Sequence, residues 1–147
     1  MTYDYSFIRF SIVGAVGWLE FNRPPVNAFS RQMVDETHDC IEAALADPKV
    51  RVLVLASAVD AYFSAGADLN AFKGLSADGI LDWTKRCHAI VRLLRGSTKP
   101  LLAAINGTAV GGGPWARWRQ ARISAKASTL SWKSVRPGGI SIANSRT

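Results

Sequence analysis

Two largely apolar runs constrain the fold of this chain more than any other feature of its sequence. They occupy residues 50–56 (VRVLVLA) and 100–105 (PLLAAI), and Arg51 is their only charged residue. Short runs that are apolar on both faces are typical of strands buried within a parallel sheet. A helical pattern over roughly residues 77–94 lies between them, as a crossover between parallel strands requires. The sequence therefore predicts two adjacent parallel strands.

The segment before the first run predicts a hairpin and a rigid connection. Residues 7–13 and 16–21 are rich in β-forming side chains and are separated by a Gly-Ala pair. Two prolines fix the connection at residues 22–28 (NRPPVNA), since they cannot donate to a sheet. Strand pairs that alternate with helices indicate the α/β class.

Two helices are expected around the first apolar run. Ser30 is a suitable N-cap for the first helix, and Asp47-Pro48 ends it. Ser76 is a suitable N-cap for the second helix, and residues 59–70 are expected to form a single loop before it. The inward-facing side chains are predicted to be Met33, Val34, Ile41, Ala44 and Leu45 on the first helix, and Ile80, Cys87, Val91 and Leu94 on the second.

The charges divide the chain into two parts with a sharp border at Gly113/Pro114. All 11 acidic residues precede that border, whereas seven of the 18 lysines and arginines and three of the five tryptophans follow it. The whole net charge of +7 therefore belongs to the last part. We expect residues 1–113 to form the N-terminal part of a domain and residues 114–147 to be a diverged basic tail.

Length and composition exclude several classes of protein. A chain of 147 residues with 48% hydrophobic residues supports one domain with a core. No apolar run approaches the ~18 residues that span a bilayer, so we expect a cytoplasmic protein without a membrane partner. Cys40 and Cys87 are too few for a disulfide framework, and with His88 they lack the spacing of a metal site.

Two glycine-centred loops each follow a predicted buried strand. They are residues 62–70 (YFSAGADLN) and 107–113 (GTAVGGG), and neither has the pattern of a phosphate-binding loop. Side by side, they could hold one carbonyl oxygen between two backbone donors, which is an oxyanion hole. Alternatively, the glycines only permit close packing of strands against helices. Glycine spacing alone leaves both interpretations open.

Three motifs in a fixed order resemble the enoyl-CoA hydratase/isomerase family, also called the crotonase family. They are LEFNRPPVNAFS at residues 19–30, FSAGADL at 63–69 and KPLLAAINGTAVGGG at 99–113. The resemblance implies an α/β fold built as a crotonase-like spiral of ββα units, here incomplete at the C-terminus. It also implies binding of acyl-CoA thioesters and stabilisation of their enolate in an oxyanion hole, within fatty-acid or related acyl-CoA metabolism.

The resemblance implies specific site residues but no metal and no redox cofactor. The two oxyanion-hole donors are expected at the backbone N–H groups of Ala67 and Gly112. The coenzyme A moiety is expected near Pro25 and Val26. Residues expected to contact substrate are Ala65, Ala67, Asp68, Leu69, Asn70 and Gly112.

The sequence departs from the family where acid/base groups are expected. Pro114 and Trp115 stand at the place of one catalytic glutamate, and Lys133-Ser134 stands where a Pro-Glu pair belongs. No aspartate or glutamate follows Asp82. The alternative to an active enzyme is therefore a catalytically inactive, truncated remnant that at most binds acyl-CoA. The resemblance also implies a trimer or hexamer, which we do not expect here because the family builds it with a C-terminal region that residues 114–147 do not resemble.

Three interpretations of residues 114–147 stay open. A basic segment with tryptophans can bind nucleic acid, although no domain presents these residues and we expect no such partner. The segment can also be a genuinely diverged end of a family member. A reading-frame shift near codon 113 is favoured by the abrupt change in composition, with the frame partly restored around Arg122.

Most charged residues on the two predicted helices are expected to face solvent. His38, near Asp35 and Asp39, is expected to be a solvated side chain on the polar face of the first helix. The basic residues of the second helix are expected to be solvated, or to attract the phosphates of coenzyme A. These are Lys85, Arg86, Arg92 and Arg95.

Overall fold

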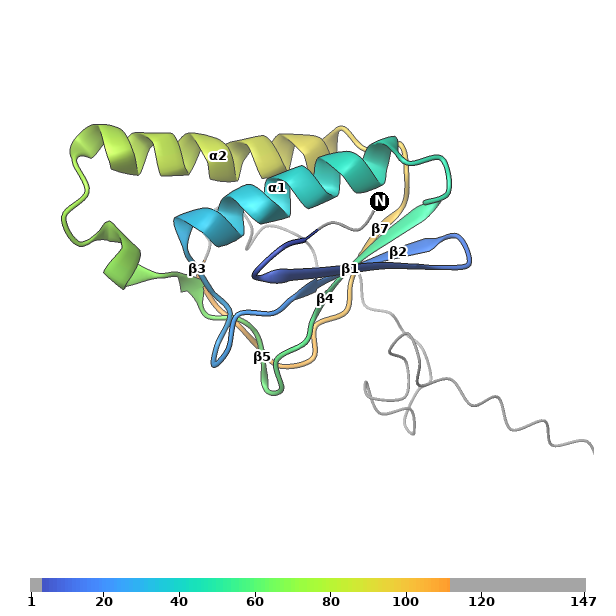
Figure 1. Ribbon diagram of the computed structural model, residues 1–147, viewed down its shortest axis with the longest axis horizontal. Helices are drawn as coiled ribbons and strands as arrows, with labels where there is room; N and C mark the ends of the chain where they lie inside the picture. Colours follow the sequence, from blue (N-terminus) through green and yellow to red (C-terminus); the bar gives the residue numbers. More distant parts are fainter. Residues whose placement is uncertain (1–3, 112–147) are drawn as a thin grey trace, which may run out of the picture.

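The computed structural model describes residues 4–111, which form an α/β unit around a four-stranded sheet (Figure 1). The strands are β1 (Ile8–Val13), β2 (Val16–Phe21), β4 (Val52–Ser57) and β7 (Leu101–Ala103), in the order β1-β2-β4-β7. β1 and β2 are an antiparallel hairpin, and β2–β4 and β4–β7 are parallel pairs. The predicted hairpin and the predicted adjacency of the two apolar runs are therefore confirmed.

Two helices pack on the same side of this sheet (Figure 1). α1 (Arg31–Ala46) begins at Ser30, whose side chain accepts a hydrogen bond from the Met33 N–H, and it ends before Asp47. α2 (Ala77–Arg95) begins in the same way at Ser76, which accepts from the Gly79 N–H. Both predicted N-caps are confirmed, because a serine oxygen satisfies one of the free N–H groups at each helix start.

The connections contain short elements that the sequence did not predict. They are β3 (Ala28–Phe29), β5 (Tyr62–Ser64), β6 (Gly66–Ala67), the 3-10 helix η1 (Leu69–Phe72) and β8 (Thr108–Ala109). The expectation of a single loop over residues 59–70 is therefore wrong. Within residues 4–111 these strands pair with one another, β3 with β6 and β5 with β8, and at two or three residues each they are too short to show a local periodicity.

The core lies between the sheet and the two helices. Its fully buried side chains include Leu19, Leu53, Met33, Ile41 and Ile90. The predicted inward faces are confirmed except at two positions. Leu45 is only partly buried against the core. Ile80 is 43% exposed, because the N-terminal end of α2 extends beyond the start of α1 (Figure 1).

The second apolar run is a strand, but its expected burial is wrong. β7 has three residues instead of six, and Leu102 and Ala103 are exposed. Within residues 4–111, β7 pairs only with β4 and is the edge of the sheet. No described element covers its outer side, which explains why an apolar sequence is exposed there.

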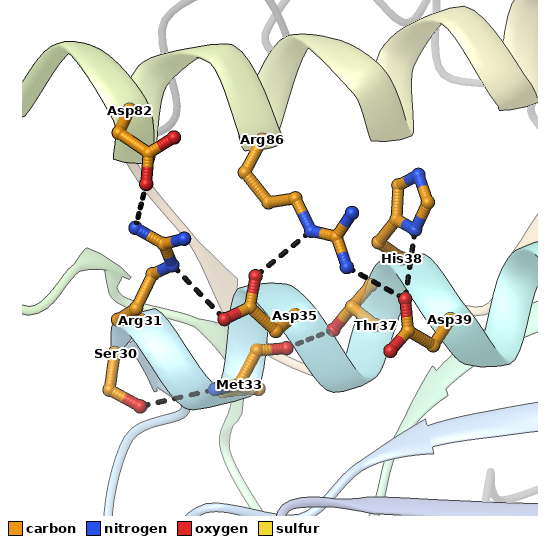
Figure 2. Close-up of polar contacts among 9 residues, drawn as sticks. All are labelled: Ser30, Arg31, Met33, Asp35, Thr37, His38, Asp39, Asp82 and Arg86. Carbon is orange, nitrogen blue, oxygen red and sulfur yellow. Dashed lines mark hydrogen bonds and ion pairs between the residues drawn. The ribbon is translucent and has the colours of Figure 1, made fainter.

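Ion pairs join the two helices at their facing surfaces (Figure 2). Arg31 on α1 pairs with Asp82 on α2 at 2.6 Å and with Asp35 at 3.0 Å. Arg86 on α2 pairs with Asp35 at 2.9 Å and with Asp39 at 2.7 Å. The expectation that Arg86 is solvated is therefore wrong, because it lies between two carboxylates of α1. The other three basic residues of α2, which are Lys85, Arg92 and Arg95, are exposed as expected.

His38 is also not the solvated side chain that its sequence position indicates. Its side chain is 12% exposed, and Nδ1 lies 3.0 Å from Oδ1 of Asp39. His38 lines an open groove of about 550 Å³ together with Ala89 and Leu93 of α2. Packing of α2 against α1 therefore covers the histidine.

Among residues 4–111, neither helix is long and apolar enough to cross a membrane.

We predict that Leu53→Ala lowers the free energy of unfolding by about 2–5 kcal/mol, the usual result of emptying a packed leucine site. Leu53 is fully buried in β4. Leu102→Ala on the neighbouring β7 is the matched control, since Leu102 is 36% exposed. The control should cost about 1 kcal/mol or less. Urea denaturation followed by circular dichroism checks both values, and equal losses would contradict the described core.

Candidate functional site

The two glycine loops lie side by side because β5 and β8 form a parallel pair. The Thr108 N–H donates to the Ala61 carbonyl at 2.8 Å, and the Val110 N–H donates to the Ser64 carbonyl at 3.0 Å. These bonds fix the segment that follows β7 along the segment that follows β4. Two stretches more than forty residues apart in sequence thereby share one edge of the molecule.

Gly66 and Gly111 lie in close contact across the two loops. Their φ angles are +86° and +72°, a region that side-chain-bearing residues rarely adopt. A Cβ atom on Gly66 would lie 2.9 Å from both the Gly111 Cα and the Val110 carbonyl oxygen. Only glycine at both positions allows this approach. Gly112, the predicted second oxyanion donor, lies outside the described residues.

A buried asparagine connects the site loops to the main sheet. Asn27 is fully buried, and its Nδ2 donates to Ser57 Oγ at 2.8 Å and to the Phe63 carbonyl at 3.1 Å. Its own carbonyl accepts from Ser64 Oγ at 3.1 Å. The sequence did not single out Asn27, Ser57 or Ser64. The available signal was an asparagine after a Pro-Pro pair, a residue type that tolerates the φ of +51° found here.

The connection that holds Pro25 and Val26 lies against the first glycine loop. The Ala65 N–H donates to the Val26 carbonyl at 2.9 Å. Beyond it, β3 pairs with β6, so that Phe29 faces Ala67. The structure therefore brings the predicted coenzyme A residues next to Ala65, one of the residues predicted to contact substrate.

Two hydrogen bonds from neighbouring residues hold the Asp68 carboxylate in place. Its Oδ2 accepts from Arg23 Nη2 at 2.8 Å, and its Oδ1 accepts from the Asn70 N–H at 3.0 Å. The hydrogen bond from Arg23 holds the pKa of the Asp68 carboxyl below its usual value. Arg23 was not singled out in the sequence, because its partner lies 45 residues away.

The predicted site residues differ in exposure. Pro25 and Asn70 are exposed, and Leu69 is 76% exposed. Ala65 and Ala67 are half-buried. Apart from Gly112, the structure places all the predicted site residues on the two neighbouring segments at residues 25–26 and 65–70.

Residues 4–111 hold one group with the ligand types of a metal site. Ligand atoms of His38, Asp39 and Glu42 lie within 4.8 Å of one another. Arg86 donates to the same Asp39 oxygen that faces His38, and its positive charge opposes a cation there.

The two cysteines lie in the core. Burial raises the pKa of Cys40 to about 12 and that of Cys87 to about 11, so both thiols are protonated at neutral pH.

Sequence comparison relates the chain to known enzymes. The family described as enoyl-CoA hydratase/isomerase matches residues 11–116. A crotonyl-CoA hydratase of Syntrophomonas wolfei is 35% identical over 96 residues, which are 65% of this chain and 37% of that protein. The human mitochondrial methylglutaconyl-CoA hydratase is 30% identical over 87 residues, 59% of this chain and 26% of that protein. The chain thus spans well under half the length of these relatives.

Solved structures show the same fold. An enoyl-CoA hydratase/carnithine racemase from Magnetospirillum magneticum superposes with a TM-score of 0.69 at 28% identity, over 75% of this chain and 42% of that one. The human mitochondrial delta3-delta2-enoyl-CoA isomerase gives a TM-score of 0.66 at 28% identity, over 70% and 41% of the two chains. The described residues therefore have the α/β crotonase-like fold.

We predict that Gly66→Ala destabilises the chain more than Gly74→Ala. The two glycines have nearly equal φ angles of +86° and +83°, but a Cβ on Gly74 meets no described atom within 4 Å. Gly74→Ala should therefore cost only the left-handed backbone penalty of about 1–2 kcal/mol. Gly66→Ala adds the overlap with Gly111. Thermal unfolding measures both, and indistinguishable losses would show that the two loops do not touch.

We also predict that Arg23→Gln raises the pKa of the Asp68 carboxyl towards its ordinary value. A lowered folded-state pKa means that the unfolded chain holds this proton more tightly. The interaction therefore stabilises the fold above the ordinary pKa of an aspartate, and this contribution is lost as the pH falls through the lowered value. Carboxyl carbon NMR during an acid titration checks the shift. An unchanged Asp68 titration in the variant would contradict the ion pair.

Proposed function

This chain belongs to the enoyl-CoA hydratase/isomerase family, and we propose that it binds acyl-CoA thioesters and polarises their carbonyl group. The backbone N–H groups of Ala67 and Gly112 are the proposed donors of the oxyanion hole. One observation carries the proposal, namely the contact between Gly66 and Gly111. Each of these glycines immediately precedes a proposed donor in the sequence, and their contact is therefore what supports the proposed pair.

The pairing of β6 supports an outward direction for the Ala67 N–H. The Asp68 N–H donates to the Phe29 carbonyl of β3. Successive N–H groups of an extended chain point to opposite sides. The Ala67 N–H therefore points away from β3. That is the geometry that a donor to a bound thioester oxygen needs.

Pro25 and Val26 are the proposed contacts for coenzyme A. Pro25 is exposed and Val26 is half-buried, on a connection whose inner side is held by Asn27. The bond from Ala65 to Val26 fixes this connection to the glycine loop. A thioester that extends from one segment to the other would place coenzyme A at residues 25–26 and its acyl group at residues 65–70.

The chemistry after polarisation depends on groups that this sequence does not supply in the usual places. A polarised thioester has a more acidic α-proton, but a positioned acid or base must still move it. Asp68 is the only acid in the two glycine loops. Its lowered pKa makes it a weak base, and Arg23 occupies one of its oxygens. Trp115 and Ser134 stand where the family has glutamates, and neither is a base at neutral pH without a partner.

We therefore propose thioester binding and enolate stabilisation without efficient hydration. The alternative is the inactive remnant, which binds acyl-CoA at most without polarising it. The missing carboxylates favour a low rate under both proposals, because each positioned acid or base typically contributes ~10²–10⁴-fold. Carbonyl polarisation, not turnover, is the property that separates them.

We predict that the purified chain binds crotonyl-CoA and does not hydrate it at a rate near the ~10 s⁻¹ typical of enzymes. Isothermal titration with crotonyl-CoA measures binding, and loss of enoyl absorbance measures hydration. Free coenzyme A and crotonic acid are the controls for the two ends of the ligand. Absence of binding would overturn the proposed function, and hydration at an ordinary enzymatic rate would overturn its restriction to binding and polarisation.

A further inference from the structure

Arg23 connects the two segments of the proposed site and has no assigned role in it. Its Nη1 donates to the Ala28 carbonyl at 2.6 Å, and its Nη2 pairs with Asp68 at 2.8 Å. One guanidinium thus bonds both β3 and the residue that follows Ala67. Arginine suits this task because its planar fork presents several donors in fixed directions.

Arg23 is itself held in one position. Its backbone N–H donates to Asn27 Oδ1 at 2.7 Å, and its carbonyl accepts from the Asn27 N–H at 2.9 Å. The guanidinium carbon lies 5.5 Å from the centre of the Phe7 ring, a cation–π distance. The Arg23 side chain is 26% exposed. These contacts restrain both the backbone and the guanidinium of Arg23, so that Arg23 holds the Asp68 carboxylate in one position.

The partner of Arg23 borders the proposed donor directly. On one side of Ala67, the Gly66 N–H donates to Ser64 Oγ at 3.0 Å. On the other side, Asp68 is fixed by its own N–H to Phe29 and by its carboxylate to Arg23 and Asn70. The peptide group that carries the Ala67 N–H therefore lies between two restrained residues. Of these restraints, the bond to Arg23 is the only ion pair.

We propose that Arg23 is a positioning residue that acts through Asp68 to orient the Ala67 N–H toward a bound thioester carbonyl. The proposal rests on the proposed function. It predicts that loss of Arg23 weakens polarisation of the thioester carbonyl at residues 65–70. Affinity for coenzyme A at residues 25–26 should not change. A residue that only holds the fold together, or one that contacts coenzyme A directly, would not separate these two properties.

The experiment uses butyryl-CoA labelled with ¹³C at the thioester carbon, because this saturated ligand cannot be hydrated. Hydrogen bonds to the carbonyl move its ¹³C signal downfield, so the bound shift reports polarisation. Titrations with butyryl-CoA and with free coenzyme A measure affinity separately. The full chain is compared with Arg23→Gln, Asp68→Asn and the double variant.

In both single variants we expect the bound signal to move back toward that of free butyryl-CoA. Affinity for butyryl-CoA should fall by up to about tenfold, as for loss of one hydrogen bond between the Ala67 N–H and the thioester carbonyl. Affinity for free coenzyme A should stay within about twofold. The double variant should match the singles, since Arg23 and Asp68 act as one unit. Asp68→Asn keeps the shape of the side chain and an oxygen for Asn70, so it tests the idea even if Arg23→Gln folds poorly.

Arg86→Gln is the matched control for losing an arginine with two partners. Arg86 has a similar exposure of 31% and pairs with Asp35 and Asp39. This variant should leave the bound ¹³C signal unchanged. An unchanged signal in Arg23→Gln or Asp68→Asn, additive effects in the double variant, or an equal loss of coenzyme A affinity would each overturn the proposal. Failure of the unmodified chain to bind butyryl-CoA would instead overturn the proposed function together with it.

Discussion

Asn27 is the residue on which the arrangement of the site loops depends. It is fully buried, and its amide links three separate chain segments through Phe21, Ser57 and Phe63. Removing the partners of a buried polar group leaves it unsatisfied at a cost of about 1–3 kcal/mol. The network therefore specifies one position for the connection 22–28 relative to the sheet. β3, Val26 and Arg23 all belong to this connection or follow it, so their contacts with the first glycine loop depend on it.

The two glycine loops use a different constraint, which is steric. The sheet brings residues 62–67 and 107–111 to one edge, but ordinary side chains there would keep the backbones apart. Gly66 and Gly111 remove that obstacle and adopt positive φ angles. Close backbone approach is what two N–H groups need in order to share one oxygen. The same glycines that permit packing thus permit the proposed chemistry, and the two interpretations left open by the sequence are compatible.

Ion pairs occur between the two helices and at the candidate site, and their consequences differ. Between α1 and α2, Arg31 and Arg86 bridge three aspartates at partly exposed positions (Figure 2), and such pairs typically add only about 0–1 kcal/mol each to stability. At the site, Arg23 and Asp68 are less exposed, at 26% and 16%. The hydrogen bond from Arg23 holds the pKa of Asp68 below its usual value, which makes this carboxylate a weak base. The pairing thus favours the proposed orienting role of Asp68 over a role in proton transfer.

The sequence by itself determined the hairpin, both capped helices, the parallel pairing of residues 50–56 and 100–105, and the family. Those features follow from local pattern, since periodicity, serine caps and glycine motifs act over a few residues. Only the tertiary structure decided that Ile80 and Leu102 are exposed, that Arg86 and His38 are covered, and that Asn27 and Arg23 hold the site loops. Each of these depends on a partner far along the chain, such as Arg23 on Asp68. The sequence pattern predicts which strands pair, but it does not predict which individual side chains meet, because those contacts are fixed only when the helices and strands pack.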